Sequence, residues 1–161
     1  MLDEAKKMPL AYLAGAMEHA PDRGAAWRAE MAAFLTHELG HRVFNPCVEE
    51  LNILRPEERA QLSAWKRSDL PRFREAVRKL IHTDLNTLLN EVDYVVCLWD
   101  RHVLRGGGTH GELTMAHYHG IPVYLVAGMP IPEISSWILG CTTEVFTDFG
   151  ELKAYLRERY R

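Results

Sequence analysis

The chain has 161 residues, of which 47% are hydrophobic and 25% are charged, and its formal net charge is −3. A chain of this length folds as one domain and buries enough surface to need no metal ion or disulfide for stability. The negative charge argues against a nucleic-acid partner, and no apolar run reaches the ~20 residues of a membrane helix.

The three cysteines, Cys47, Cys97 and Cys141, are scattered along the chain and form no Cys-x-x-Cys pair. An odd and scattered set is not typical of a secreted disulfide framework. The N-terminus also lacks the long apolar core of a signal peptide. We therefore expect a cytoplasmic protein with reduced cysteines and no membrane partner.

The first part of the chain predicts two strands around a helix. Pro9–Gly15 is a short apolar run that ends at a glycine, as a buried strand does. Ala25–Glu38 has apolar residues at helical spacing, and His41–Phe44 is a second short strand. Residues 48–68 are polar and predict a loop with one short helix. We interpret residues 51–70 as an insertion or lid over one end of the sheet.

A longer helix is predicted from Pro71 to Asn90, because proline suits the first turn of a helix. Tyr94–Trp99 is the clearest buried strand of the chain, and a glycine-rich turn follows it. The remaining predicted elements are a helix at Thr109–His119, a strand at Pro122–Val126, a short helix at Ile134–Leu139, a weak strand at Glu144–Phe146 and a terminal helix that Asp148 caps.

This alternation of strands and helices predicts a single doubly wound α/β domain with a mostly parallel, five-stranded sheet and helices on both faces. In such folds a ligand binds beyond the carboxyl ends of the strands, near the point where the strand order reverses. The rule selects four segments, which are Gly15–Arg23, Asn45–Glu50, Trp99–Glu112 and Ala127–Ser136.

The turn Gly106–Glu112, GGGTHGE, is the strongest candidate for a ligand-facing segment. Its glycines let the backbone approach a ligand closely, and Thr109 opens a helix whose N-terminus favours an anionic or oxygen-rich group. Its spacing matches neither a P-loop nor a dinucleotide fingerprint. Glu112 allows two interpretations: Thr109-x-x-Glu112 matches a capping box, whereas its position after a strand favours a reactive role.

Asp84 shares the apolar face of the long predicted helix, where a carboxylate is costly unless it is paired or functional. In one interpretation it turns to the rim and binds a backbone group. In the other it reaches the strand ends and joins Glu112 and Asp100 in a carboxylate cluster suited to proton transfer. Tyr12, near the end of the first strand, is either a core residue or part of this site.

Other polar residues predict no further chemistry. His110, His117 and His119 are close in sequence, but no His-x-x-x-His pair with a following carboxylate emerges. We therefore expect no metal ion and no cofactor. Asp93 is interpreted as a structural residue at the entry of a strand.

Several of these residues together resemble the nucleoside 2-deoxyribosyltransferase superfamily, which includes 2′-deoxynucleoside 5′-phosphate N-hydrolases. The resemblance covers most of the chain except Leu51–Leu70. It rests on Tyr12-Leu13-Ala14-Gly15, Asn45-Pro46, Asp84, Asp93, Gly108-Thr109-x-x-Glu112, Ala116 and Gly120-Ile121-Pro122-Val123.

The resemblance implies a flavodoxin-like sheet of order 2-1-3-4-5 and a retaining attack on the N-glycosidic bond of a nucleoside or nucleotide. Glu112 would be the nucleophile that forms a glycosyl ester, and Asp84 would assist departure of the base. Tyr12 would orient the nucleophilic carboxylate. The sugar would then pass to a second base or to water, as in retaining glycosidases.

The resemblance also implies a substrate pocket and a homodimer or larger homo-oligomer. The residues expected to bind substrate are Gly15, Met17, Asn45, Asp100, Gly108, Thr109 and Ser135. Ser135 occupies the place of a serine that, in phosphate-using members, reaches a neighbouring subunit's site. The first loop departs from the family, because Ala16 follows Gly15 where proline is common.

Two other functions stay open at the level of sequence. A nucleotide-sensing module would keep the pocket without turnover. A hydrolase of NAD or of a nucleotide sugar would use a related fold on a different substrate. The first would bind a ligand and release no base, and the second would release nicotinamide or ADP-ribose.

Overall fold

The computed structural model describes residues 7–161, and its core is a five-stranded sheet of order β2-β1-β3-β4-β5 in which every pairing is parallel. The expected strand order is confirmed, and the sheet is parallel throughout rather than mostly parallel. The strands are β1 (Leu10–Gly15), β2 (Arg42–Phe44), β3 (Tyr94–Trp99), β4 (Val123–Ala127) and β5 (Glu144–Phe146).

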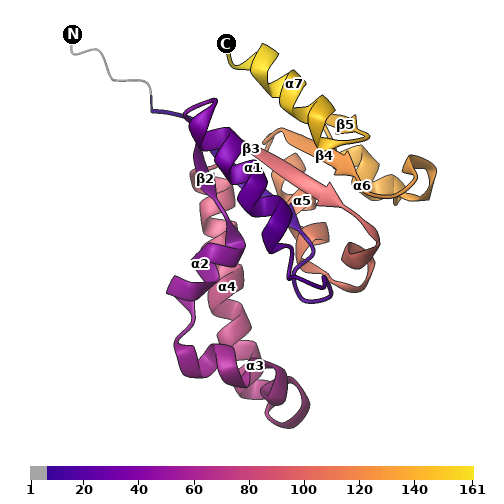
Figure 1. Cartoon of the computed structure of the whole chain (residues 1–161). Helices are drawn as coiled ribbons and strands as arrows, with labels where there is room; N and C mark the ends of the chain where they lie inside the picture. Colours follow the sequence, from indigo (N-terminus) through magenta and orange to yellow (C-terminus); the bar gives the residue numbers. More distant parts are fainter. Residues whose placement is uncertain (1–6) are drawn as a thin grey trace.

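Helices join successive strands and lie on both sides of the sheet (Figure 1). Each strand-to-strand crossover therefore packs back onto the sheet, as parallel connections require. The helices are α1 (Ala25–His37), α2 (Pro46–Ile53), α3 (Pro56–Ser68), α4 (Leu70–Asn90), α5 (Gly108–Tyr118), α6 (Ser136–Cys141) and α7 (Phe149–Arg159), with 3₁₀ turns η1 (Arg101–Arg105) and η2 (Ile131–Glu133).

Two apolar clusters divide the core along the two faces of the sheet. Alternate residues of β1 separate between them, so that Leu13 packs with Met31 and Leu35 of α1 while Tyr12 packs on the other face. That second cluster contains Leu88 of α4 together with buried residues of α5 and α6. The side chain of Tyr12 therefore faces the same space as α4 and α5.

The segment between β2 and β3 is more helical than predicted. Residues 46–68 form two helices, α2 and α3, rather than a loop with one short helix. Asn45 caps α2 by accepting a hydrogen bond from the backbone N–H of Cys47, and Pro46 occupies the first turn. Asn45 followed by Pro46 is a typical sequence pattern for a helix start, but the polar residues that follow gave no apolar periodicity that would indicate a helix.

The helices α3 and the first half of α4 form an arm that extends away from the sheet (Figure 1). Ion pairs supply part of its cohesion, since the buried carboxylate of Glu58 accepts hydrogen bonds from Lys79 Nζ at 2.8 Å and Arg55 Nε at 3.1 Å. Ile81 of α4 is 45% exposed, although the residue is apolar. The apolar stripe of α4 is thus buried on the sheet only toward its end, around Leu88.

Two structural expectations are confirmed. The carboxylate of Asp93 accepts a hydrogen bond from the backbone N–H of Leu10 at 2.7 Å and so ties the starts of β1 and β3 together. Asp148 caps α7 by accepting from the N–H of Glu151 at 2.8 Å. Cys47, Cys97 and Cys141 are free thiols.

The buried end of α4 predicts how much its packing contributes to stability. Leu88→Ala removes a fully buried side chain from the cluster and should lower the free energy of unfolding by about 2–5 kcal/mol. Leu51→Ala, at a position that is 59% exposed on α2, should change it by less than about 0.5 kcal/mol. Urea denaturation measures both, and equal effects would contradict the assignment of the core.

Candidate active site

The candidate site lies where the chain crosses from β1 to β2 and later returns to β3 on the other side of β1. This reversal is the topological switch point, and loops at the carboxyl ends of β1 and β3 flank it. Tyr12 comes from β1, Asp84 from α4 and Glu112 from α5. Three elements that are distant in sequence therefore supply the three predicted catalytic residues.

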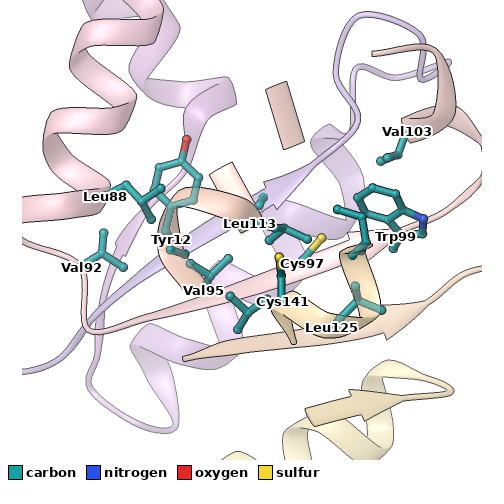
Figure 2. Packing of buried hydrophobic residues seen from close by; sticks show 14 of the residues in the cluster. Tyr12, Leu88, Val92, Val95, Cys97, Trp99, Val103, Leu113, Leu125 and Cys141 are labelled. Carbon is teal, nitrogen blue, oxygen red and sulfur yellow. The ribbon is translucent and has the colours of Figure 1, made fainter. Parts of the chain in front are cut away.

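Tyr12 is fully buried, and its ring stacks on Phe44 of β2 with 5.2 Å between ring centroids. Its hydroxyl has no hydrogen-bond partner and points out of the apolar cluster (Figure 2). Burial raises the pKa of this phenol well above its usual range, and the nearby charges of Glu112 and Asp84 raise it further. The hydroxyl therefore stays protonated and is free to donate.

Glu112 is half-buried on the first turns of α5. Its carboxylate folds back toward Gly108, because a Cβ on that glycine would lie 3.6 Å from Oε1. Loss of solvent raises the pKa of Glu112 to about 8, while the Tyr12 hydroxyl and the Arg28 charge act in the opposite direction. Tyr12 and Glu112 influence each other in this way, although the hydroxyl does not reach full hydrogen-bonding geometry.

The capping-box interpretation of Glu112 is wrong. Gly107 is the N-cap of α5, and no side chain makes a capping hydrogen bond there. Thr109 lies inside the helix and is buried, so it is not the capping residue that the motif requires. The carboxylate of Glu112 is consequently not engaged in holding the helix start.

Asp84 is half-buried on α4, and loss of solvent raises its pKa to about 7. The carboxylates of Glu50 and Glu49 on α2 raise it further, and Arg28 lowers it. Among the causes of this shift there is no backbone hydrogen bond, which the rim interpretation required. The charge of Asp84 also raises the pKa of Glu112, so the protonation of Glu112 depends on that of Asp84.

Asp100 has a local structural contact, and its place in the carboxylate cluster stays a prediction. Its Oδ1 accepts a hydrogen bond from the backbone N–H of His102 at 3.0 Å and caps η1. Asp100 is also absent from the groups that shift the pKa of Glu112. The 3₁₀ turn that uses this carboxylate was not predicted from the sequence, and a short turn of this kind leaves no apolar periodicity to find.

The other residues expected to bind substrate lie in loops at this edge or on its helices. Gly15 ends β1 so closely packed that a Cβ would meet the Trp27 ring at 2.9 Å, and Met17 is half-buried in the loop that follows. Asn45 uses its carboxamide oxygen to cap α2. Ser135 is exposed before α6, and its role across an interface stays a prediction.

Sequence reasoning missed Arg28, the most deeply buried charged residue near the site, at 1% exposure. Its guanidinium donates to five backbone carbonyls at both ends of the loop between β1 and α1. The acceptors are Leu13 at 3.2 Å, Gly15 at 2.8 Å, Ala16 at 3.3 Å, Arg23 at 3.4 Å and Gly24 at 3.2 Å. The sequence did contain a signal for its burial: Arg28 precedes Met31 by three residues and Leu35 by seven, and these spacings place all three side chains on the same helix face.

Two more buried polar atoms lack partners at the end of β3. Trp99 Nε1 and His110 Nδ1 are unpaired, and their rings meet edge to face with centroids 4.8 Å apart. Buried polar atoms are almost always satisfied in folded proteins. A polar ligand or a water molecule bound here could form hydrogen bonds with Trp99 Nε1 and His110 Nδ1.

Within residues 7–161, no group of three or more His, Cys, Asp or Glu side chains is arranged to hold a metal ion. In the same part of the chain, no helix combines the length and the apolar character needed to cross a membrane.

Comparison with protein-family models and with curated protein sequences finds no match. Among solved structures, a 2-deoxyribosyltransferase from Bacillus psychrosaccharolyticus matches with a TM-score of 0.65 and 21% identity over 91% of each chain. A conserved protein from Enterococcus faecalis has a TM-score of 0.65 and 18% identity, over 94% of this chain and 99% of that one. The CMP N-glycosidase of Clostridium botulinum has a TM-score of 0.51 and 15% identity, over 93% and 98%.

At these identities the likeness establishes a shared fold over nearly the whole chain. The resemblance that the motifs suggested is thus confirmed at the level of the fold. The match also spans residues 51–70 in part, since more than nine-tenths of the chain is covered.

The raised pKa of Glu112 predicts how its removal affects stability. A carboxyl that titrates near its ordinary 4.5 when unfolded and at about 8 when folded stabilises the fold below pH 4.5. That contribution is lost as the pH rises toward 8, because the folded state must then hold a desolvated charge. Glu112→Gln mimics the neutral form. Its melting temperature should match that of the wild type near pH 5 and exceed it near pH 9.

Glu144→Gln, at an exposed position of β5, is the matched control and should show no such divergence. Differential scanning calorimetry across pH 5–9 provides the measurement. A Glu112→Gln variant that is less stable than the wild type at pH 9 would show that the ionised carboxylate is well solvated or paired.

Proposed function

We propose that the protein cleaves the N-glycosidic bond of a nucleoside or nucleotide through a glycosyl ester on Glu112. The observation that carries this proposal is the closeness of Glu112 and Asp84 to the buried Tyr12 of the inner strand β1, where both carboxylate charges raise the pKa of the phenol. Two proteins of the same fold are described as a 2-deoxyribosyltransferase and a CMP N-glycosidase, and both act on this type of bond. The acceptor of the sugar is water or a second base.

The three residues divide the chemistry between them. The ionised carboxylate of Glu112 attacks C1′ of the sugar, and the C1′–N bond breaks with its electron pair leaving on the base. Protonated Asp84 gives its proton to the departing base. In the second step the Asp84 carboxylate takes a proton from water or from the incoming base, which attacks C1′ and releases Glu112. The Tyr12 hydroxyl donates to the Glu112 carboxylate and orients it.

Burial prepares these groups for their roles. Asp84, with a pKa raised to about 7, holds a proton at neutral pH that an ordinary aspartate would have lost. Glu112, with a pKa raised to about 8, is a more basic and more nucleophilic carboxylate than an exposed glutamate once it is ionised. The reactive form therefore combines an ionised Glu112 with a protonated Asp84, and it is a minority of the enzyme at any pH.

Glu112→Ala should abolish release of the base while the protein stays folded by circular dichroism. The assay incubates the protein with nucleosides and their 5′-monophosphates, with and without a second free base, and separates products by chromatography. Glu144→Ala, an exposed glutamate on β5, should keep wild-type activity. Full activity in Glu112→Ala would rule out the assignment. Thermal stabilisation by nucleosides without any base release would favour the sensing module.

The two pKa values predict the pH dependence of kcat/KM. Activity should rise through a limb near pH 7, fall through a limb near pH 8 and peak between them, because both correct protonation states are required. Asp84→Asn should lower kcat/KM by about 100-fold or more and remove the alkaline limb, since no acid remains to be lost. An alkaline limb that survives in Asp84→Asn would contradict the role of Asp84.

A further inference from the structure

Within residues 7–161, Arg28 is a buried cation that forms no ion pair with a carboxylate. Its guanidinium donates to five carbonyl oxygens, lies 3.6 Å from Cys47 Sγ through Nη1, and stands over the Trp27 ring at 4.9 Å from the ring centroid. A guanidinium removed from water at 1% exposure is costly unless carbonyls or charges compensate it. Its positive charge lowers the pKa of Glu112, Asp84 and Tyr12 in the site, and also that of Cys97 on β3 and of Asp22 in the loop between β1 and α1.

The loop is shaped around this guanidinium. Arg23 and Gly24 both adopt left-handed backbone conformations, with φ of 57° and 75°, and their carbonyls accept from Nη1. A Cβ on Gly24 would lie 2.3 Å from that same nitrogen. A left-handed arginine is strained, so the conformation persists because the surrounding contacts demand it.

The same contacts fasten the loop to α2. Cys47 Sγ donates to the carbonyl of Arg23 at 3.3 Å, and Arg23 Nη2 binds both carboxylate oxygens of Glu50 at 3.0 and 3.2 Å. Glu50 in turn belongs to the set of charges that surround Asp84. The carbonyl groups that surround the Arg28 guanidinium are therefore linked to Asp84 through the side chains of Arg23 and Glu50.

We propose that Arg28 is a positioning residue for the reaction of Glu112. It fixes the loop between Gly15 and Gly24 over the site, and it places a permanent positive charge beside the catalytic carboxylates. The charge favours the ionised form of Glu112, which is the form that attacks the sugar. This inference rests on the proposed function, and its electrostatic part can be measured without turnover.

The groups that face Glu112 come from several elements, and the test must separate Arg28 from them. They are the Tyr12 hydroxyl from β1, the Cys97 thiol from β3, Asp84 from α4 and, behind Asp84, Glu49 and Glu50 from α2. These groups are neutral or anionic. Two groups lower the pKa of Glu112, the neutral Tyr12 hydroxyl and the charge of Arg28, so loss of the Arg28 charge should make Glu112 harder to ionise.

The test compares Arg28→Gln with Arg28→Lys. Loss of a nearby opposite charge shifts a carboxyl pKa by about 1 unit or more. Arg28→Gln should therefore raise the pKa of both Glu112 and Asp84, move both limbs of kcat/KM upward by about 1 pH unit and lower kcat/KM at pH 6 by about tenfold. Arg28→Lys keeps the charge but loses the planar fork, so it should keep the acid limb and raise KM instead.

Arg42→Gln is the matched control, because Arg42 of β2 likewise donates to a backbone carbonyl, that of Met8 at 3.1 Å, but is not among the groups that shift the pKa of Glu112. Its pH profile should coincide with that of the wild type. If Arg28→Gln and Arg28→Lys lose equal activity with an unmoved acid limb, Arg28 is merely structural and the proposal is overturned.

Two further measurements cover failure of folding and failure of the proposed function. Should Arg28→Gln not fold, Gly24→Ala displaces the guanidinium while keeping its charge in the chain, and it should raise both KM and the acid limb; an unchanged profile would overturn the proposal. Should no substrate release a base, the carboxyl carbon of Glu112 can be titrated by NMR in glutamate-labelled protein, with Glu112→Gln providing the assignment. The midpoint should rise in Arg28→Gln, and an unmoved midpoint would refute the inference.

Discussion

The carboxyl end of β1 is held in place by the buried side chain of Arg28, which five hydrogen bonds to backbone carbonyls fix. Arg28 projects from α1 into the turn and fills the donors of its guanidinium with backbone carbonyls on both sides of the loop. A lysine could not satisfy acceptors in so many directions, because its donors radiate from one atom. The loop, the start of α1 and the first turn of α2 all take their positions from this arrangement.

Desolvation and that positive charge act against each other on the same carboxylates. Burial favours the protonated forms of Glu112 and Asp84, while Arg28 favours the ionised forms. Burial is the larger cause at both residues, so ionisation of either carboxyl in the folded protein is unfavourable. Sites that hold carboxyl groups of this kind are commonly functional, because a structural carboxylate would be paired or solvated instead.

Apolar runs and glycine-terminated turns predicted the five strands because they report burial directly, whereas the strand order followed from the resemblance to a known family. Asp84 and Glu112 were selected because a carboxylate on an apolar face or after a glycine-rich turn conflicts with local patterning, and Tyr12 because it lies near a strand end and matches the family's motif. The burial of Arg28 was not predicted, because arginine side chains are normally exposed and only the apolar residues of α1 were assigned to its buried face. The sequence could not give the protonation states of the carboxylates, which depend on solvent loss at contacts between distant segments.

The helices α2 and α3 escaped prediction for a different reason. Their residues are mostly polar, and the arm that α3 builds with α4 is held partly by ion pairs around Glu58 rather than by a continuous apolar stripe. Such a helical hairpin makes mainly local contacts. The sequence indicates the residues that cap these helices, but it does not indicate that α3 packs against α4.

The central position of β1 has a consequence for how the protein is assembled. Its first neighbour, β2, follows after one helix, but its second neighbour β3 is paired across a separation of 83 residues, as the bond from Leu10 to Asp93 shows. Long-range parallel pairings form late, because the loop between them must close first. During synthesis on the ribosome, the edge of β1 that pairs with β3 therefore stays unpaired until α4 and β3 have emerged. The hydroxyl of Tyr12 and the carboxylate of Glu112 meet only after that closure, so the site depends on the strand pairing with the longest separation in sequence.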